Sequence, residues 1–494
     1  MKLTKKKQVA VVGGGITGLV AAHSLLSLGE NVQVTLFEQS LTGGKITSGN
    51  IASIEVDLGP DSFIAKRTAT KDLAVAIGLE HYLVEPASND FDLWLDKSLI
   101  AYPKHTYLGI PNDPIVVKNI LSKRGFKDLK ADLRAKKHTG EDLTIQDLLE
   151  PRIGREALNI LVEPLAAGIH AGSVSTLGVA ATNPELLAAA VGHGSLIKGL
   201  KSLSQAHEPT ELGVKPEPLF LGIKGGINKL TDALLNSLIE SDDFVLNLGT
   251  QITNIVKIGN QFRVVSDPLG SDTSKLGEEH LTHIEDDEIS QFYDGIIVAL
   301  GPHNNSQIFS SISSVASNML DTVKTASVSV VTLALPIDTM TFASGKRGYL
   351  VPRIGHEIGK SRRIPITTAV TYMSEKWPHL KRDGLGIIRI SCGRIDDTRH
   401  LQLDDNELIK EIKLELELAV QKPIHIADKR VTRWLNAFPQ YEPDHLLKSS
   451  KIRSAIEETG NITIASSALG GIGIGSRIDD AVKRSVFMLK RLQN

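Results

Sequence analysis

The chain has 494 residues, which is too long for a single hydrophobic core and predicts two or three domains. Its 55 lysines and arginines nearly balance 57 aspartates and glutamates, so the overall charge argues against nucleic acid as a partner. The single cysteine, Cys392, excludes an internal disulfide and a cysteine metal cluster, and its setting in IIRISCGR predicts a buried structural thiol.

At the N-terminus, lysines precede an apolar stretch, an order that is also found in signal peptides. Three consecutive glycines interrupt the stretch and no small-residue cleavage site follows, so we expect this segment to belong to the fold. No run of about 18 apolar residues occurs, so no transmembrane helix is predicted. Together with the scarcity of cysteine, these features favour a cytoplasmic location.

Residues 8–12 predict a buried strand, and helix spacing begins at Leu19. A second strand, 33–37, ends at Glu38, 20 residues beyond Gly18. Between the first strand and the helix lies a glycine turn formed by Gly13, Gly14, Gly15, Ile16, Thr17 and Gly18. This order is typical of dinucleotide binding, because the glycines admit the pyrophosphate and the helix start offers it free amides. The acid at position 38, followed by Gln39, would accept the ribose hydroxyls and disfavours NADP.

Two further turns follow this nucleotide-binding unit. Gly43 and Gly44 allow another close backbone approach, and Lys45 can stand beside a phosphate or a flavin. A second turn could present backbone groups to an isoalloxazine ring, and it consists of Gly59, Pro60, Asp61 and Ser62. A plain NAD enzyme does not need these turns, so we expect FAD as the cofactor.

The combination of GGGITGL, FEQS, GGKI and DLGPDSF resembles the flavin monoamine oxidase superfamily and, within it, the porphyrinogen oxidases of haem synthesis. EPLAAGIHAG, residues 163–172, is similar to the EPLLAGIYAG block of bacterial porphyrinogen oxidases, and the similarity covers nearly the whole chain. We expect an α/β protein with a discontinuous Rossmann-like FAD-binding domain, a mixed-sheet substrate domain and a helical domain. The expected boundaries are 1–90, 219–302 and 450–494 for the first, 91–109 and 303–449 for the second, and 110–218 for the third.

The resemblance also implies several site residues. The backbone of Ile252 would meet the adenine, and Trp434 would pack beside the flavin. Ile472, Gly473 and Ile474 would contact the flavin, where the dipole of the last helix would stabilise the reduced anion.

The chain departs from the family at two places. It reads GIGIGSRI where GVGIPDCI is more frequent, and Asp90 stands where mitochondrial-type enzymes carry an arginine that contacts a substrate propionate. The second departure favours the bacterial coproporphyrinogen branch.

The function implied by the resemblance is oxidation of coproporphyrinogen III to coproporphyrin III by FAD and molecular oxygen, with release of hydrogen peroxide, in haem biosynthesis. Protoporphyrinogen IX is the alternative substrate. More distant alternatives are an amine oxidase, a carotene desaturase, or a non-enzymatic prenyl-protein carrier of the same fold. Because the flavin accepts the hydride, no catalytic side chain and no metal is expected.

Four propionates call for cations around an apolar cavity. The candidate substrate residues are Lys66, Arg67, Arg347, Tyr349 and Arg433. A solvated surface charge is the alternative for each cation, and a buried strand position is the alternative for the tyrosine. The basic segment 118–138 interleaves apolar residues, which predicts contact with an anionic membrane or a downstream haem-pathway enzyme, or a charged face over a core stripe.

Overall fold

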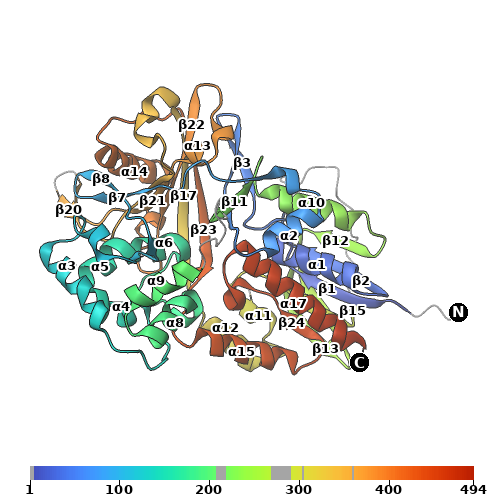
Figure 1. The fold of residues 1–494 in the computed structure, drawn as a ribbon. Coiled ribbons are helices and arrows are strands. Elements are labelled where there is room, and N and C mark those ends of the chain that lie inside the picture. Colours follow the sequence, from blue (N-terminus) through green and yellow to red (C-terminus); the bar gives the residue numbers. More distant parts are fainter. Residues whose placement is uncertain (1–4, 207–217, 269–290, 303–304, 359–360, 494) are drawn as a thin grey trace.

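The computed structural model describes residues 5–206, 218–268, 291–302, 305–358 and 361–493. Two lobes lie side by side in Figure 1: one contains a parallel sheet and both chain ends, and the other contains a mixed sheet with a layer of helices below it. The acidic run 285–288, expected as a solvated hairpin tip, lies outside the described residues.

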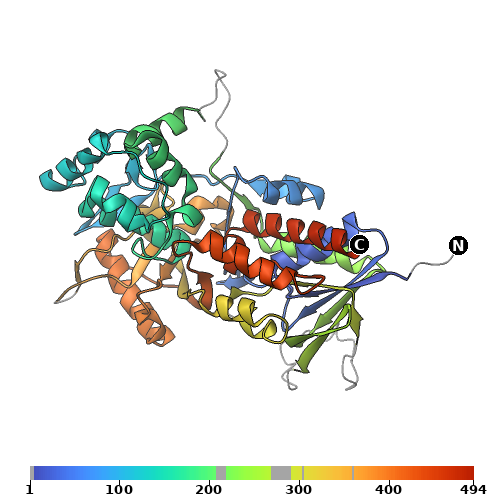
Figure 2. The ribbon, with the colours of Figure 1, turned by 90° about the horizontal axis from the view of Figure 1, so that it is seen from below.

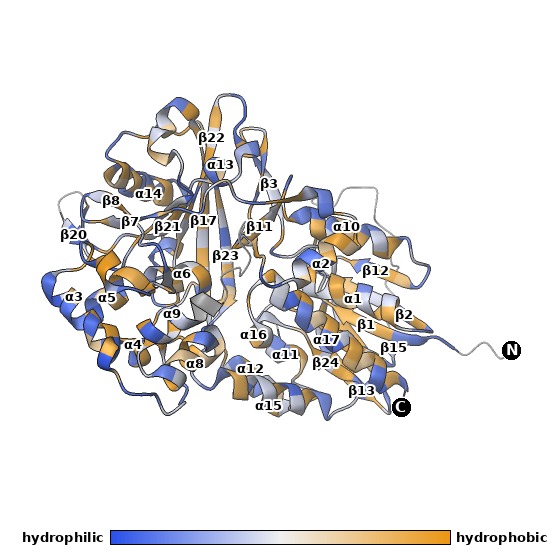
Figure 3. Cartoon of the chain, viewed as in Figure 1, coloured by the Kyte–Doolittle hydropathy of each residue, from blue (hydrophilic) through white to orange (hydrophobic). Residues whose placement is uncertain are grey.

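A five-stranded parallel sheet forms the centre of the first lobe, in the order β12-β2-β1-β16-β24. Its strands are β1 (Lys7–Val12), β2 (Val32–Glu38), β12 (Phe244–Leu248), β16 (Gly295–Val298) and β24 (Ile462–Ile464). Figure 3 shows the apolar character of β1 and β2, which suits strands that are covered on both faces. Three separate stretches of the chain therefore build one sheet.

One face of this sheet is covered by α1 (Ile16–Leu28), α10 (Asn228–Ile239) and α17 (Ile474–Gln493), as Figure 2 shows from below. The first and last helices pack against each other, and the hydroxyl of Ser485 donates to the carbonyl of Ala21 at 3.1 Å. The beginning and the end of the chain thus share one layer.

The opposite face is covered by an antiparallel sheet and three helices. These elements are β13 (Thr250–Ile258), β14 (Gln261–Pro268), β15 (Phe292–Tyr293), α11 (Asn305–Ile308), α12 (Ser314–Asp321) and α15 (His445–Glu457). Ile308 and Leu320 share a core with Phe37 and Ile252. Both α11 and α12 follow residue 302, so they were expected in the substrate domain. Their apolar faces instead pack on the nucleotide sheet.

The second lobe contains a seven-stranded sheet in the order β23-β17-β22-β21-β18-β7-β8. Its strands are β7 (Asp92–Leu95), β8 (Ser98–Ala101), β17 (Thr325–Pro336), β18 (Gly348–Leu350), β21 (Thr367–Thr371), β22 (Leu385–Cys392) and β23 (Asp428–Pro439). One face packs under α14 (Asp405–Val420), and Cys392 is buried there, as predicted. The other face packs against α13 (Met373–Lys376) and the hairpin of β3 (Ser48–Ile51) and β4 (Ile54–Asp57).

A helical layer packs beneath this sheet. Its helices include α3 (Lys123–Leu129), α4 (Ile145–Ile153), α6 (Glu163–His170), α8 (Pro184–His193) and α9 (Leu196–Ala206). In the basic segment, Leu121 and Leu129 are buried while Lys123, Arg124 and Lys127 are exposed. This arrangement agrees with a charged face over a core stripe, and contact with a membrane or partner stays a prediction.

Glu163 joins the helical layer to the mixed sheet. Its carboxylate lies 3.2 Å from the guanidinium of Arg394, accepts the Val174 N–H at 2.9 Å, and both charged side chains are 3% exposed. Since a buried charge that loses its partner is strongly destabilising, this pair fixes how the two layers meet.

We expect Glu163→Gln to lower the free energy of unfolding by about 3 kcal/mol, because Arg394 would lose its buried counter-charge. Denaturant unfolding would measure this change. The control is Glu357→Gln, which breaks an exposed pair with Lys97 and should cost under about 1 kcal/mol. Equal losses in the two variants would contradict a special role for the buried pair.

Candidate functional site

The glycine turn after β1 has a shape that larger residues would disrupt. Gly13 has φ +106°, and a Cβ there would lie 2.8 Å from the carbonyl oxygen of Ala299. A Cβ on Gly18 would lie 1.8 Å from the carbonyl oxygen of Gly13. No side chain caps α1 at Gly15, so amides of its first turn are free to meet a phosphate.

A second glycine loop lies directly beside this turn. The Gly43 N–H donates to the Gly14 carbonyl at 2.9 Å, and Gly15 and Gly43 form a parallel bridge. Gly44 has φ +61°, and a Cβ there would lie 3.2 Å from the Cα of Gly15. The two loops therefore form one cradle in which backbone, with few side chains, is presented to a ligand.

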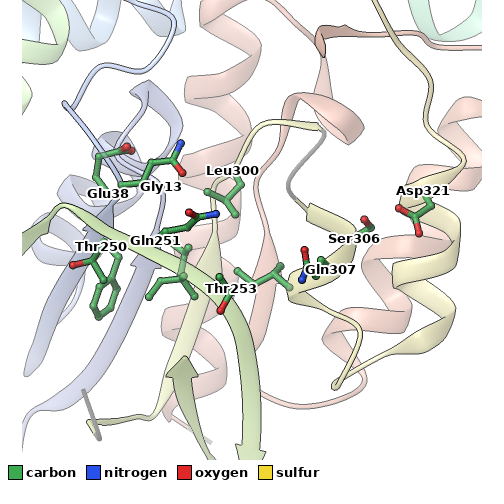
Figure 4. Close-up of a pocket in the computed structure, with 14 residues that line it drawn as sticks. Gly13, Glu38, Thr250, Gln251, Thr253, Leu300, Ser306, Gln307 and Asp321 are labelled. Carbon is green, nitrogen blue, oxygen red and sulfur yellow. The ribbon is translucent and has the colours of Figure 1, made fainter. Parts of the chain in front are cut away.

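Glu38 stands at the end of β2, beside the turn, as the sequence predicts. Its Oε2 accepts the Gly14 N–H at 2.7 Å, and its Oε1 accepts the Ser40 N–H at 2.9 Å. These bonds orient the carboxylate toward a cavity of about 360 Å³, shown in Figure 4.

This cavity brings together four residues that the sequence analysis selected: Gly13, Glu38, Gln39 and Ile252. Its further polar lining was missed and comprises Thr250, Gln251, Thr253, Ser306, Gln307 and Asp321. The last three lie on α11 and α12, which were expected in the substrate domain. No local motif marks them, so only the packing of those helices could reveal them.

Lys45 follows the second glycine loop and lies close to Gly59 and Gly301. A Cβ on Gly301 would lie 4.0 Å from its Nζ, and a Cβ on Gly59 would lie 1.8 Å from its carbonyl oxygen. Desolvation, and then the nearby charge of Arg477, lower the pKa of Lys45, although its side chain is open to solvent. A solvent-accessible cation beside the glycine loops suits an anionic ligand.

The side chains of the turn Gly59–Ser62 are used to fasten it to the mixed sheet. Lys376 Nζ donates to Asp61 Oδ2 at 2.7 Å and to the Ser62 hydroxyl at 2.9 Å. Trp377 Nε1 donates to the same carboxylate oxygen at 2.8 Å, and Arg389 Nη1 donates to the Gly59 carbonyl at 3.0 Å. These bonds occupy the side chains of Asp61 and Ser62 and the Gly59 carbonyl, so Pro60 and the remaining backbone are the parts of the turn that they leave unused.

The charge of Asp61 depends on these contacts. Burial alone would raise its pKa, but the Lys376 ammonium and the Arg389 guanidinium outweigh that effect and hold the pKa below its ordinary value. The carboxylate therefore remains charged and holds both cations beneath the turn.

The loop that precedes α17, residues 470–473, is called the closing loop below. It lies at the same end of the site as Trp434. The indole N–H of Trp434 donates to the Leu58 carbonyl at 3.1 Å, one residue before the turn. Gly473 faces open space, and α17 begins at Ile474 directly after Ile472 and Gly473. Arg67 Nη1 donates to the Ser476 hydroxyl on the first turn of α17 at 2.8 Å.

The candidate substrate residues separate into two groups. Arg347 lies between two rings, 4.6 Å from the centroid of Phe91 and 5.5 Å from that of Phe220, and its guanidinium has no carboxylate hydrogen-bonded to it among the described residues. Burial lowers the pKa of Arg347. Lys66 is exposed beside Arg67.

Arg433 and Tyr349 do not reach this site, which corrects the prediction for both. Arg433 pairs with Asp405 at the start of α14 and donates to the Leu403 carbonyl at 3.0 Å. Tyr349 is 2% exposed in the core beneath α14. Because successive strand residues face opposite sides, Arg433 points to α14 while its neighbour Trp434 points to the other face, where it contacts the Leu58 carbonyl.

Asp57 ends β4 and holds the loop before α10. Its Oδ1 accepts the Ile227 N–H at 2.8 Å. Burial raises the pKa of Asp57 to about 7; the hydrogen bond from Ile227 opposes this rise, and the neighbouring Asp61 carboxylate adds to it.

A raised folded-state pKa means that the proton on Asp57 stabilises the fold, and that this stability is lost as pH rises from about 4 toward about 7 and above. Asp57→Asn keeps the acceptor oxygen and removes the titration. We expect the variant to gain on the order of 2 kcal/mol relative to wild type between pH 4 and pH 8. Thermal unfolding across that range would measure it, and parallel pH profiles would count against the raised pKa.

The described part of the chain contains no group of three or more histidine, cysteine, aspartate or glutamate side chains that could hold a metal ion. None of its helices has the length and apolar character needed to cross a membrane.

Comparison with known proteins agrees with this geometry. The family of flavin containing amine oxidoreductases matches residues 16–485. The coproporphyrinogen III oxidase of Bacillus subtilis (strain 168) is 26% identical over 485 residues and 96% of each chain, and that of Staphylococcus aureus (strain NCTC 8325 / PS 47) is 26% identical over 462 residues and 92% of each chain.

A crystal structure from Exiguobacterium sp. 255-15, provisionally assigned as a protoporphyrinogen oxidase, superposes with a TM-score of 0.83 at 22% identity and covers 99% of both chains. This likeness shows the fold, with its Rossmann-like parallel sheet and its second, mixed sheet. Because the family match spans most of the chain, the protein belongs to the flavin-containing amine oxidoreductases and is a flavin-dependent oxidoreductase.

Proposed function

We propose that this chain is an FAD-dependent porphyrinogen oxidase that converts coproporphyrinogen III to coproporphyrin III with molecular oxygen and releases hydrogen peroxide. The observation that carries the proposal is a backbone-lined path with a cation beside it. The path joins the cavity at Glu38 through the paired glycine loops and Lys45 to the turn at Gly59.

The residues along this path fit FAD in chemistry as well as in shape. Glu38 is oriented for ribose hydroxyls, and the uncapped start of α1 and Lys45 suit a diphosphate. The turn at Gly59 offers backbone and Pro60, since Lys376 holds the side chains of Asp61 and Ser62. The proposed FAD contacts are Gly13, Gly14, Gly15, Ile16, Thr17, Gly18, Glu38, Gln39, Gly43, Gly44, Lys45, Gly59, Pro60, Asp61, Ser62, Ile252, Trp434, Ile472, Gly473 and Ile474.

When bound, FAD supplies the hydride acceptor, and oxygen restores it. Oxidation of a porphyrinogen removes six electrons and six hydrogens in three equal steps, so three molecules of oxygen become three of hydrogen peroxide. The chain itself binds and orients the substrate, and the sequence and site require no general base.

The choice of substrate rests on two kinds of support. Full-length relatives at about 26% identity are coproporphyrinogen III oxidases. Arg347 offers a guanidinium that lies close to two rings and to which no carboxylate of the described residues is hydrogen-bonded, as an anchor for a propionate would require. Arg67 and Lys66 are the further proposed cations, and haem biosynthesis is the proposed pathway.

Incubating the purified, FAD-loaded protein under air with each porphyrinogen tests the substrate. We expect kcat/KM for coproporphyrinogen III to exceed that for protoporphyrinogen IX at least tenfold, because the former carries two more propionates for the cations of the site. Equal or inverted preference would reassign the substrate to protoporphyrinogen IX. A colourless protein that cannot be reconstituted with FAD would overturn the enzyme proposal and favour a carrier of the same fold.

Arg347→Met tests the propionate anchor. Loss of a charge-assisted hydrogen bond of roughly 1.5–3 kcal/mol should raise KM for coproporphyrinogen III at least tenfold, with a smaller change in kcat. Arg433→Met is the matched control, since that arginine pairs with Asp405 on the other face of the sheet. An unchanged KM in Arg347→Met, or an equal rise in both variants, would remove Arg347 from the substrate site.

A further inference from the structure

A buried arginine lies behind the closing loop, for which the family resemblance implies flavin contacts from Ile472, Gly473 and Ile474. Arg477 is on the first turn of α17 and is 5% exposed. Its Nη1 lies 3.3 Å from Asp480 Oδ2, whereas Nε and Nη2 have no hydrogen-bond partner among the described residues. Buried donors without partners are costly, so a charge with this much unused capacity calls for an electrostatic role.

The surroundings of Arg477 do not neutralise it. Arg453 donates to Asp480 at 2.7 Å, and Arg484 donates to Glu457 at 2.8 Å while lying 4.0 Å from Asp480. Three guanidiniums therefore share two carboxylates, and all five side chains are 20% exposed or less. The cluster carries an excess positive charge in a region of low dielectric constant, where its field extends further than it would in water.

That field reaches the front of the site. Burial and, after it, the nearness of Arg477 lower the pKa of Lys45, which follows the opening glycine loops. On the other side, a Cβ on Gly470 would lie 2.4 Å from Nη2, and the Gly471 N–H donates to the Tyr441 hydroxyl at 2.9 Å. The start of the closing loop thus lies on the guanidinium itself, and Lys45 lies within reach of its charge.

We propose that Arg477 is a positioning residue that acts through the closing loop and favours the negatively charged, reduced state of the flavin over the oxidised state. The proposal rests on the proposed FAD site. A buried positive charge stabilises whichever state of its neighbour is more negative, and reduction adds negative charge to the ring while the diphosphate keeps the same charge in both states.

The test compares the two-electron midpoint potential of bound FAD and the dissociation constant of oxidised FAD in holoenzyme variants. Arg477→Met should shift the reduction equilibrium toward the oxidised flavin at least tenfold, which is about 30 mV for a two-electron couple. Affinity for oxidised FAD should change less than threefold. Arg477→Lys retains the charge and should restore most of the potential.

Lys483→Met is the matched control, because Lys483 is an exposed cation on the same helix and water screens it. The midpoint potential of Lys483→Met should equal that of wild type.

An unchanged potential in Arg477→Met overturns the proposal. Weaker binding of oxidised FAD without a shift in potential overturns it too, because that result would assign the charge to the diphosphate. If Arg477→Met fails to bind FAD, Arg477→Gln and Arg477→Lys supply the comparison: equal potentials in these two would likewise overturn it. Failure of all variants and wild type to bind FAD would instead refute the proposed function.

Discussion

The buried ion pair between Asp61 and Lys376 is the contact on which the geometry of the site depends. Asp61 belongs to the turn that follows the nucleotide-binding loops, and Lys376 belongs to α13 on the mixed sheet. Trp377 and Arg389 add donors to the same turn. The turn is therefore fastened to the mixed sheet, although the two segments are far apart in sequence. These bonds occupy the side chains of Asp61 and Ser62 and the Gly59 carbonyl, so the turn is fixed in place while Pro60 takes no part in them.

A chain with a formal charge of -2 concentrates cations at this site. Lys45 and Arg347 have accessible charge that no carboxylate hydrogen-bonds among the described residues, and Arg477 has buried charge in excess of its partners. The excess charge on Arg477 is unfavourable when it is buried by itself and becomes favourable beside an anion. Lys45 and Arg347 keep contact with solvent, so their charges are available to an anionic ligand without that cost.

The nucleotide half of the site could be predicted because its signals are local. The strand, the glycines and Glu38 determine one backbone path, and Gly13, Glu38, Gln39 and Ile252 line one cavity. The substrate half could not, because it depends on which face of a strand a residue occupies. Tyr349 and Arg433 both lie on the α14 side of the mixed sheet, and alternation along a strand does not by itself tell which of its two faces lines the site. The packing of α11 and α12 on the nucleotide sheet likewise had no signal in the sequence.

The departure at Asp90 gains a physical meaning from its neighbours. The family resemblance led us to expect that an acid there, in place of the arginine of mitochondrial-type enzymes, favours the bacterial coproporphyrinogen branch. In the structure, the Arg347 N–H donates to the Asp90 carbonyl at 2.8 Å, and Lys104 lies 3.3 Å from the Asp90 carboxylate. A guanidinium therefore stands next to position 90 although it comes from the segment before β18. Because Phe91 and Phe220 flank this guanidinium, position 90 has a cation beside it although the residue at 90 is itself an acid.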